Sequence, residues 1–159
     1  PGRISGTGAA QCEQCFAGSF APPPGQASCS ICSPGTFSRA AAGVCLNCAD
    51  GFYNPQSGQS VCKQCAYGQM SVSGASACST CPAGKYSDGE TFGLCRDCAA
   101  GTFAAPGMSA CTNCPLASYQ PAGGQSTCLD CPPRSSTPSE GSTTIAECTC
   151  NPGLTLTLD

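Results

Sequence analysis

Large apolar side chains recur singly along the chain, each in a stretch that is otherwise polar, small or turn-forming. Their spacing alternates between 17 and 16 residues. The series is Phe20, Phe37, Tyr53, Met70, Tyr86, Phe103 and Tyr119, with Ser136 at the next position. No stretch approaches the roughly 18 apolar residues of a membrane-spanning helix. The pattern predicts tandem repeats, each an irregular hairpin too small to fold alone.

Glycine marks two places in most repeats. The first lies two residues before the large side chain, at Gly18, Gly35, Gly51, Gly68, Gly84 and Gly101, and Ala117 and Arg134 replace it in the last two repeats. The second lies four residues before the next cysteine pair, at Gly25, Gly58, Gly74, Gly107 and Gly124. We expect a left-handed or tight backbone at the first glycine and a chain reversal at the second.

Cysteine changes the picture most, with 18 residues in 159. Eight CxxC pairs and a final CxC follow the same spacing as the large side chains. Such a content is typical of a disulfide scaffold or a metal-loaded chain. The pairs are Cys12/Cys15, Cys29/Cys32, Cys45/Cys48, Cys62/Cys65, Cys78/Cys81, Cys95/Cys98, Cys111/Cys114 and Cys128/Cys131, then Cys148/Cys150.

These features predict a small disulfide-rich fold, an elongated tandem array of short irregular β-hairpins with little regular secondary structure and no single core. Cross-links would replace the core, since each short loop closed by a disulfide contributes roughly 3 kcal/mol in the chain-entropy model. The repeat aromatics Phe20, Phe37, Tyr53, Tyr86, Phe103 and Tyr119 would cover neighbouring disulfides. At roughly 10 Å per hairpin, the array would be roughly 80–90 Å long.

Two disulfide schemes fit the spacing. In the neighbour scheme, the second cysteine of each pair bonds the first of the next, giving Cys15–Cys29, Cys32–Cys45, Cys48–Cys62, Cys65–Cys78, Cys81–Cys95, Cys98–Cys111, Cys114–Cys128 and Cys131–Cys148. Cys12 and Cys150 would then pair outside the fragment. The like-position scheme joins, for example, Cys29 to Cys45 and Cys32 to Cys48, and the 17/16 alternation favours its double unit.

CxxC pairs also serve in proteins as zinc ligands and as redox centres. Four-thiolate zinc sites have a similar spacing, which would make the chain an intracellular zinc-binding array. A thioredoxin-type redox motif is also CxxC, but it normally occurs once, at a helix start. Disulfides are favoured over both, because the same loop of glycine and aromatic lies between nearly every pair.

Charge and composition narrow the function. The chain has a net charge of −3, 9% charged residues and no histidine. An acidic, charge-poor surface argues against nucleic acid as a partner. Without histidine, the common general base and metal-ligand nitrogen are missing, so we expect no enzyme, no cofactor and no metal site. The Ser135–Pro138 segment and the surroundings of Pro22–Pro24 suggest O-glycans, with an ordinary loop as the alternative.

The sequence divides into four parts. Residues 1–11 are the end of a truncated upstream repeat, and residues 12–131 hold the tandem CxxC repeats. Residues 132–153 would form a longer terminal unit, which the resemblance given below makes EGF-like, and residues 154–159 would begin a following segment in which leucine alternates with threonine as in a strand. This layout indicates a fragment of a longer extracellular protein.

The unit Cys78-Ser79-Thr80-Cys81-Pro82-Ala83-Gly84-Lys85-Tyr86 resembles the tandem ephrin-receptor-like cysteine-rich repeat. The tail from Cys128 to Gly153 resembles the EGF-like segment of Eph receptors. The loop is also similar to the single-disulfide module of tumour-necrosis-factor receptors, whose end cysteines are bonded together, and that resemblance supports the neighbour scheme.

The resemblance implies a secreted or cell-surface location and a structural or interaction role as a stalk, spacer or surface-filament component. The partners would be proteins, including copies of the chain itself in a filament or coat. A receptor ectodomain segment that binds a protein ligand is the alternative. Phe16, Phe92 and Leu94 lie outside the repeat pattern, and contacts with a neighbouring chain or local packing would explain them.

Overall fold

The computed structural model of the chain describes residues 1–5, 12–23, 26–89 and 93–150. The predicted strand start at residues 154–159, the second glycine at Gly25 and the extra apolar residue Phe92 lie outside these ranges. The chain divides into two compact units, Pro1–Ser79 with Gly89–Leu94, and Thr80–Asp88 with Cys95–Asp159. Each unit is described by itself.

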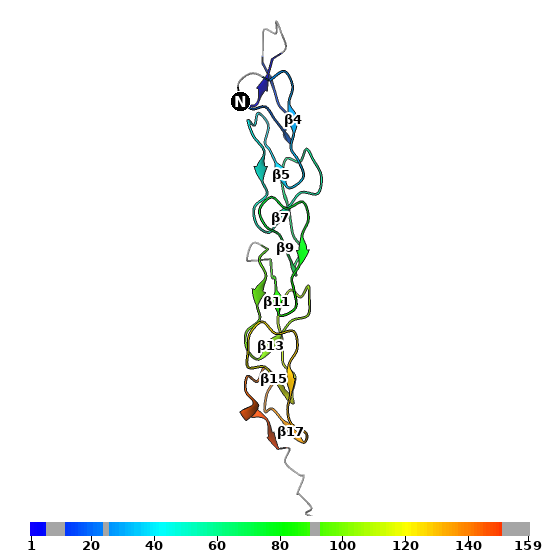
Figure 1. The fold of residues 1–159 in the computed structure, drawn as a ribbon, viewed down its shortest axis with the longest axis vertical. Helices are drawn as coiled ribbons and strands as arrows, with labels where there is room; N and C mark the ends of the chain where they lie inside the picture. Colours follow the sequence, from blue (N-terminus) through cyan, green and yellow to red (C-terminus); the bar gives the residue numbers. More distant parts are fainter. Residues whose placement is uncertain (6–11, 24–25, 90–92, 151–159) are drawn as a thin grey trace, which may run out of the picture. The chain divides into compact units, whose positions relative to one another are not determined.

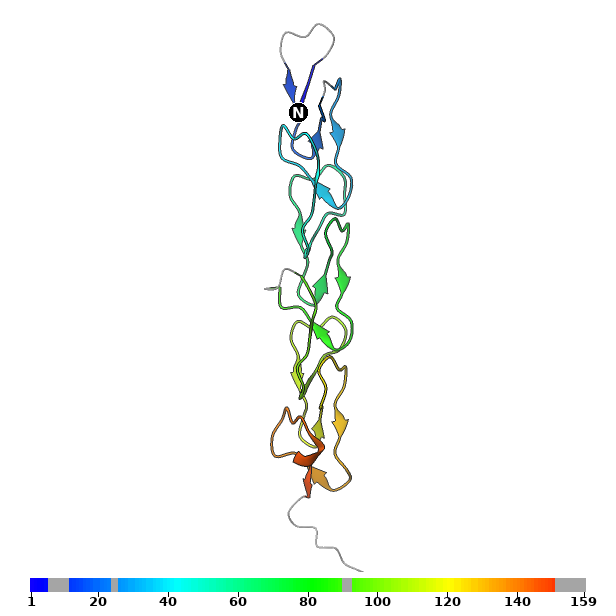
Figure 2. The same cartoon turned by 60° about the vertical axis from the view of Figure 1, so that its left-hand side comes forward.

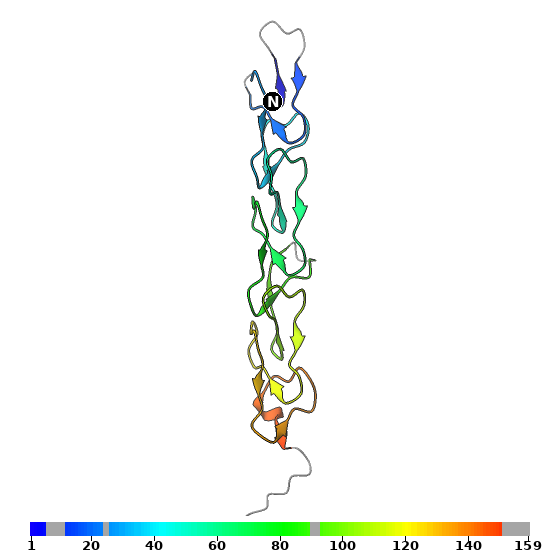
Figure 3. The same ribbon diagram turned by 90° about the vertical axis from the view of Figure 1, so that its right-hand side faces the viewer.

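The described residues form two-residue strands and one short 3-10 helix, as the predicted fold class requires. Figure 1 shows the hairpins of each unit following one another in chain order, and the views in Figure 2 and Figure 3 agree. The elements are β1 (Arg3–Ile4), β2 (Glu13–Gln14), β3 (Ser19–Phe20), β4 (Ser30–Ile31), β5 (Thr36–Phe37), β6 (Leu46–Asn47), β7 (Phe52–Tyr53), β8 (Lys63–Gln64), β9 (Gln69–Met70), β10 (Ser79–Thr80), β11 (Lys85–Tyr86), β12 (Arg96–Asp97), β13 (Thr102–Phe103), β14 (Thr112–Asn113), β15 (Ser118–Tyr119), β16 (Leu129–Asp130), β17 (Ser135–Ser136), η1 (Ile145–Glu147) and β18 (Thr149–Cys150).

Each strand pairs with its neighbour in sequence, so every sheet is a two-stranded antiparallel hairpin. We number the repeats by the cysteines that enclose them: repeat 1 is 15–29, repeat 2 is 32–45, repeat 3 is 48–62, repeat 4 is 65–78, repeat 5 is 81–95, repeat 6 is 98–111, repeat 7 is 114–128 and repeat 8 is 131–148. The residue pair between the two cysteines of a CxxC motif forms the returning strand. The longer repeat 8 contains η1 between β17 and β18.

The first glycine makes the turn that starts each hairpin. In repeat 1, the amide of Ser19 donates to the carbonyl of Phe16 over 3.1 Å, and Gly18 has a φ of 86° within this turn. Such a φ costs a glycine little because it has no Cβ. The expected left-handed backbone is thus present. Ala117 and Arg134 keep it without glycine, with φ of 64° and 66°.

Backbone hydrogen bonds join each repeat to the next within a unit. Between repeats 2 and 3, the amide of Gly35 donates to the carbonyl of Asn54 over 2.8 Å. In the same pair of repeats, Ser38 donates to Gln59 over 3.3 Å, and Gly58 donates to Cys32 over 2.8 Å. The second unit repeats this arrangement between repeats 6 and 7, with Gly101 bonded to Gln120, Ala104 to Gln125 and Gly124 to Cys98. Main-chain groups therefore supply a regular set of contacts at each of these junctions.

The first glycine also faces the repeat two further along. A Cβ placed on Gly18 would overlap the carbonyl of Gly58, and one on Gly84 would overlap that of Gly124. The same relation joins Gly2 to Ala41, Gly35 to Gly74 and Gly101 to Gly141. Glycine is therefore favoured at this position for two reasons. It adopts the left-handed φ at little cost, and it leaves room for the carbonyl that passes over its Cα.

The most buried residues differ from those expected. The aromatic rings are only half-buried, whereas the residue directly after each ring is at most 5% exposed. This position holds small or hydrogen-bonding side chains: Ala21, Ser38, Asn54, Ser71, Ser87, Ala104, Gln120 and Thr137. Together with the second cysteine of each pair, these residues form the thin interior of each unit, because the repeats approach too closely for a large ring.

Several of these buried side chains hydrogen-bond the preceding repeat. The hydroxyl of Ser38 donates to the carbonyl of Ser19 over 2.9 Å, and that of Ser71 donates to Phe52 over 3.0 Å. The amide nitrogen of Asn54 donates to the carbonyl of Thr36 over 3.0 Å. These bonds offset the desolvation of the buried polar atoms. Among the described residues, Oδ1 of Asn54 and Oγ of Ser87 have no partner.

We predict that Gly84→Ala lowers the stability of the second unit. The left-handed conformation alone costs a non-glycine residue about 1–3 kcal/mol, and the new Cβ would also displace the main chain at Gly124. The midpoint of guanidinium unfolding under oxidising conditions measures the loss. Ala117→Gly is the matched control, since it removes a Cβ from the same turn position and should leave the midpoint unchanged or slightly higher. Equal midpoints for the two variants would contradict the close approach.

Candidate functional site

The disulfide ladder is the main chemical feature of the chain. Each bond joins the second cysteine of a pair to the first cysteine of the next, which is the arrangement of the neighbour scheme. The bonds are Cys15–Cys29, Cys32–Cys45, Cys48–Cys62, Cys65–Cys78, Cys81–Cys95, Cys98–Cys111, Cys114–Cys128 and Cys131–Cys148. The sequence separation alternates between 14 and 13 residues up to the last bond, so the 17/16 alternation comes from loop length.

The two cysteines of a CxxC pair have different surroundings in the first seven pairs. There the second lies in the interior, and Cys32, Cys48, Cys81 and Cys114 are fully buried, whereas Cys128 and Cys131 of the eighth pair are both half-buried. The first lies nearer the surface. This asymmetry follows from the hairpin, because the amide of the second cysteine donates inward to the first glycine of the preceding repeat, as Cys32 does to Gly18 over 2.9 Å.

Cys12 and Cys150 are free and exposed in this structure. Their pairing with cysteines outside the fragment stays a prediction. The other cysteines are in disulfides, so no thiolate cluster of the kind needed for zinc is formed within the described ranges. Among those residues there is also no group of three or more metal-ligating side chains placed to hold an ion.

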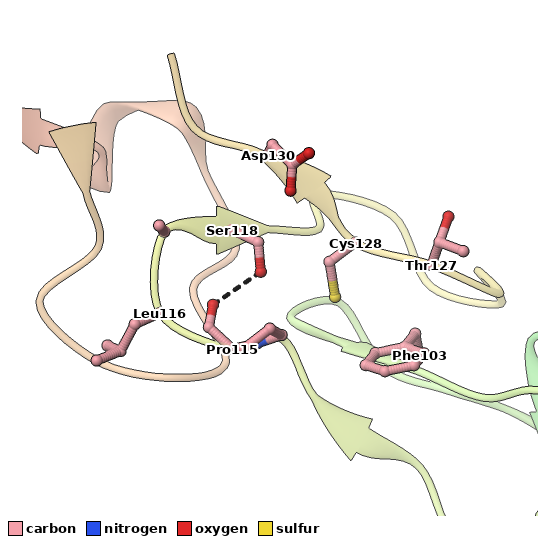
Figure 4. A pocket seen from close by; sticks show the side chains of 8 residues that line it. Phe103, Pro115, Leu116, Ser118, Thr127, Cys128 and Asp130 are labelled. Atoms are coloured by element: carbon pink, nitrogen blue, oxygen red, sulfur yellow. Dashed lines mark hydrogen bonds between the residues drawn. The ribbon is translucent and has the colours of Figure 1, made fainter. Parts of the chain in front are cut away.

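A shallow hollow recurs between successive repeats. In the second unit, a hollow of about 320 Å³ lies between the ring of Phe103 in repeat 6 and Cys128 in repeat 7 (Figure 4). Leu116 and Asp130 complete its wall, and the hydroxyl of Ser118 donates to the carbonyl of Pro115 over 2.7 Å beside it. In the first unit, Phe37 and Cys62 line the corresponding hollow of about 270 Å³.

Each of these two hollows is lined by a repeat aromatic and by a disulfide-bonded cysteine of the next repeat, Phe37 with Cys62 and Phe103 with Cys128. That the aromatics cover the neighbouring disulfides stays a prediction. The hollow in the first unit also contains Phe52, Val61 and the exposed side chain of Arg39. Such open, mostly apolar depressions suit contacts with protein side chains better than enclosure of a small molecule.

Exposed apolar side chains gather in the first unit. Phe16 is 78% exposed and Ile31 is 67% exposed, and both line one hollow with Gly58. Val61 and Tyr67 are similarly exposed, whereas Leu94 is 46% exposed. Phe16 is therefore largely exposed to solvent, and its contact with a neighbouring chain stays a prediction.

Charged groups form few contacts. Lys85 and Asp97 make a cross-strand ion pair of 2.6 Å between β11 and β12. This pair is exposed and so contributes little to stability. In repeat 8, the hydroxyl of Ser142 and the amide and hydroxyl of Thr143 stabilise the carboxylate of Glu147, which lowers the pKa of that carboxyl below the ordinary 4.5.

The burial of the residue directly after each repeat aromatic could not be predicted from the sequence. Its occupants range from alanine to glutamine, so it carries no single-residue signature. The available signal was the lack of any large apolar residue at that place in repeats 1 to 8.

None of the described helical segments has the length and apolar character needed to cross a bilayer.

The disulfide pattern and the repeated hairpin can be compared with known protein families. A protein-family model described as tyrosine-protein kinase ephrin type A/B receptor-like matches residues 2–42, 35–71 and 101–148. These spans together cover well over half of the chain. No curated protein matches the chain.

We predict that proteolysis of the oxidised protein without reduction will release the eight neighbour-linked peptide pairs. The structure places the sulfurs of each pair together and keeps like-position cysteines apart in separate bonds. Mass spectrometry of the released peptides identifies the links, and alkylation before digestion should label Cys12 and Cys150 if no outside partner is present. A peptide that links Cys29 to Cys45 would support the like-position scheme instead.

Proposed function

The chain belongs to the tyrosine-protein kinase ephrin type A/B receptor-like family, and from this premise we propose that it is a non-catalytic stalk or spacer. Repeats of this kind are extracellular interaction modules, and the many disulfides point to an extracellular or cell-surface location. The array would hold protein-binding surfaces at a fixed distance from the structure to which it is attached.

The backbone ladder between repeats is the observation that carries the proposal. Because main-chain groups such as the amide of Gly35 and the carbonyl of Asn54 join the repeats, the outward side chains are not needed for stacking. A spacer needs this property, since its length must be set independently of its surface. The disulfides of the buried cysteines also close each repeat covalently.

The exposed side chains of the first unit favour a second function, that of protein binding. Phe16 and Ile31 offer apolar area beside a hollow, and aromatic residues of this kind are enriched at protein interfaces. A soluble protein ligand or a second copy of the chain would each fit. A second copy would make the array a component of a surface filament or coat.

The spacer proposal predicts a length that grows with repeat number. Duplicating residues 49–81 in tandem after Cys81 adds two hairpins and should lengthen the maximum dimension by about 20 Å, at roughly 10 Å per hairpin. Small-angle X-ray scattering of both oxidised proteins measures the difference. An unchanged maximum dimension would refute the spacer role.

Sedimentation velocity over a wide concentration range separates the spacer from the filament. A spacer should remain monomeric, and Phe16→Ser with Ile31→Ser should leave its sedimentation unchanged. Self-association that this double variant abolishes, and that the control Ile145→Ser in the other unit leaves intact, would support the filament instead. Both variants alter exposed residues, so folding should be preserved.

A further inference from the structure

The second turn of a repeat rests in a contact site formed by earlier repeats, and we call this site the seat. One wall is the first glycine two repeats earlier, whose bare Cα lies under the incoming carbonyl. In the second unit this glycine is Gly84 under Gly124 and Gly101 under Gly141. The seat therefore exists only where the first-glycine position has no Cβ.

The other wall of the seat is the side chain that precedes the second cysteine of a pair. A Cβ on Gly124 would lie 3.2 Å from Oδ1 of Asp97, and one on Gly141 would lie 3.7 Å from Oδ1 of Asn113. Extending this order by one repeat gives a seat formed by Ala117 and Asp130. The seat after it would be formed by Arg134 and Thr149.

These two last seats are blocked. Ala117 and Arg134 have φ of 64° and 66°, in the same left-handed region as the first glycines but a few degrees below their values of 71° to 86°. Their Cβ atoms therefore point where a Cβ on Gly84 or Gly101 would overlap the passing carbonyl. Ala41 has a similar φ of 58°, but it occupies the second-turn position and presents its carbonyl to Gly2, so its Cβ does not obstruct a seat.

The hydrogen bonding changes at the same point. In repeats 5 and 6 the amide of the first glycine donates to a main-chain carbonyl, that of Ala104 or Gln120. In repeat 7 the amide of Ala117 instead has the hydroxyl of Thr137 as its acceptor, over 3.2 Å. This one bond of the ladder thus changes to a side-chain acceptor where the glycines end, whereas Gln120 and Gly141 still donate to the main-chain carbonyls of Ser142 and Cys114.

We infer that repeats 7 and 8 cap the stack, so that their outer surface rejects another repeat of this kind. The side chains at positions 117 and 134 carry this inference, which is independent of the spacer proposal.

Three oxidised full-length variants test the cap. The first is the internal duplication of residues 49–81 after Cys81. The second places the same segment directly after Cys150, in place of residues 151–159, so that Cys150 takes the position of Cys48. The third adds Ala117→Gly and Arg134→Gly to the second. Amide hydrogen exchange of the copied Gly58 and Gly74 reports stacking, because these amides bond the preceding repeat in the native array.

The copied glycine amides should be protected in the first variant, should exchange like an unstructured peptide in the second, and should regain protection in the third. The native Gly141 amide, which donates to the carbonyl of Cys114, should stay protected in all three and shows that the array itself is folded. Protection in the second variant would overturn the cap. Loss of protection of the copied amides in the first variant would also overturn the cap, and so would a lack of recovery in the third variant. In either case, glycine at the first-turn position would not be what permits stacking.

Discussion

The absence of a Cβ at the start of repeats 1 to 6 is the constraint on which the stack depends. At Gly18 and Gly84, the left-handed turn and the carbonyl from two repeats further on occupy the same small space. A side chain there would disturb both the hairpin and the stack. Each repeat thus contacts its next neighbour through hydrogen bonds and the following one through this close approach, and the units cohere although no hairpin has a core of its own.

Close approach also explains the interior. A large ring has no room between main chains that pass so near to one another, so the rings stay at the edge and small or hydrogen-bonding residues lie inside. Ser38 and Ser71 replace the missing apolar burial with bonds to the preceding repeat. The buried sulfur of the second cysteine fills the remaining space, which makes each disulfide both a covalent link and the main apolar contact.

The repeat, the hairpins and the fold class could be read from the sequence because cysteine and glycine recur at fixed spacing. The half-burial of rings such as Phe37 could not, since it depends on distances between main chains of different repeats. The buried position of Asn54 was invisible for the same reason, because its side chain acts across a repeat boundary. Ala117 and Arg134 looked like departures from the pattern, and only the structure shows that they keep the glycine conformation. The likeness of the last unit to an EGF-like segment stays a prediction.

Disulfides join cysteines that are close in sequence, whereas the glycine–carbonyl approach joins residues two repeats apart. This difference favours disulfide closure before stacking while the chain is being synthesised. A disulfide such as Cys15–Cys29 spans 14 residues, so its cysteines can meet soon after the second one has been synthesised. Gly18 reaches its final surroundings only when Gly58 has followed. Short-range closure is favoured kinetically over long-range contact. Oxidation can therefore proceed from the first cysteines to the last as the chain emerges, which limits mispairing among cysteines that are chemically alike.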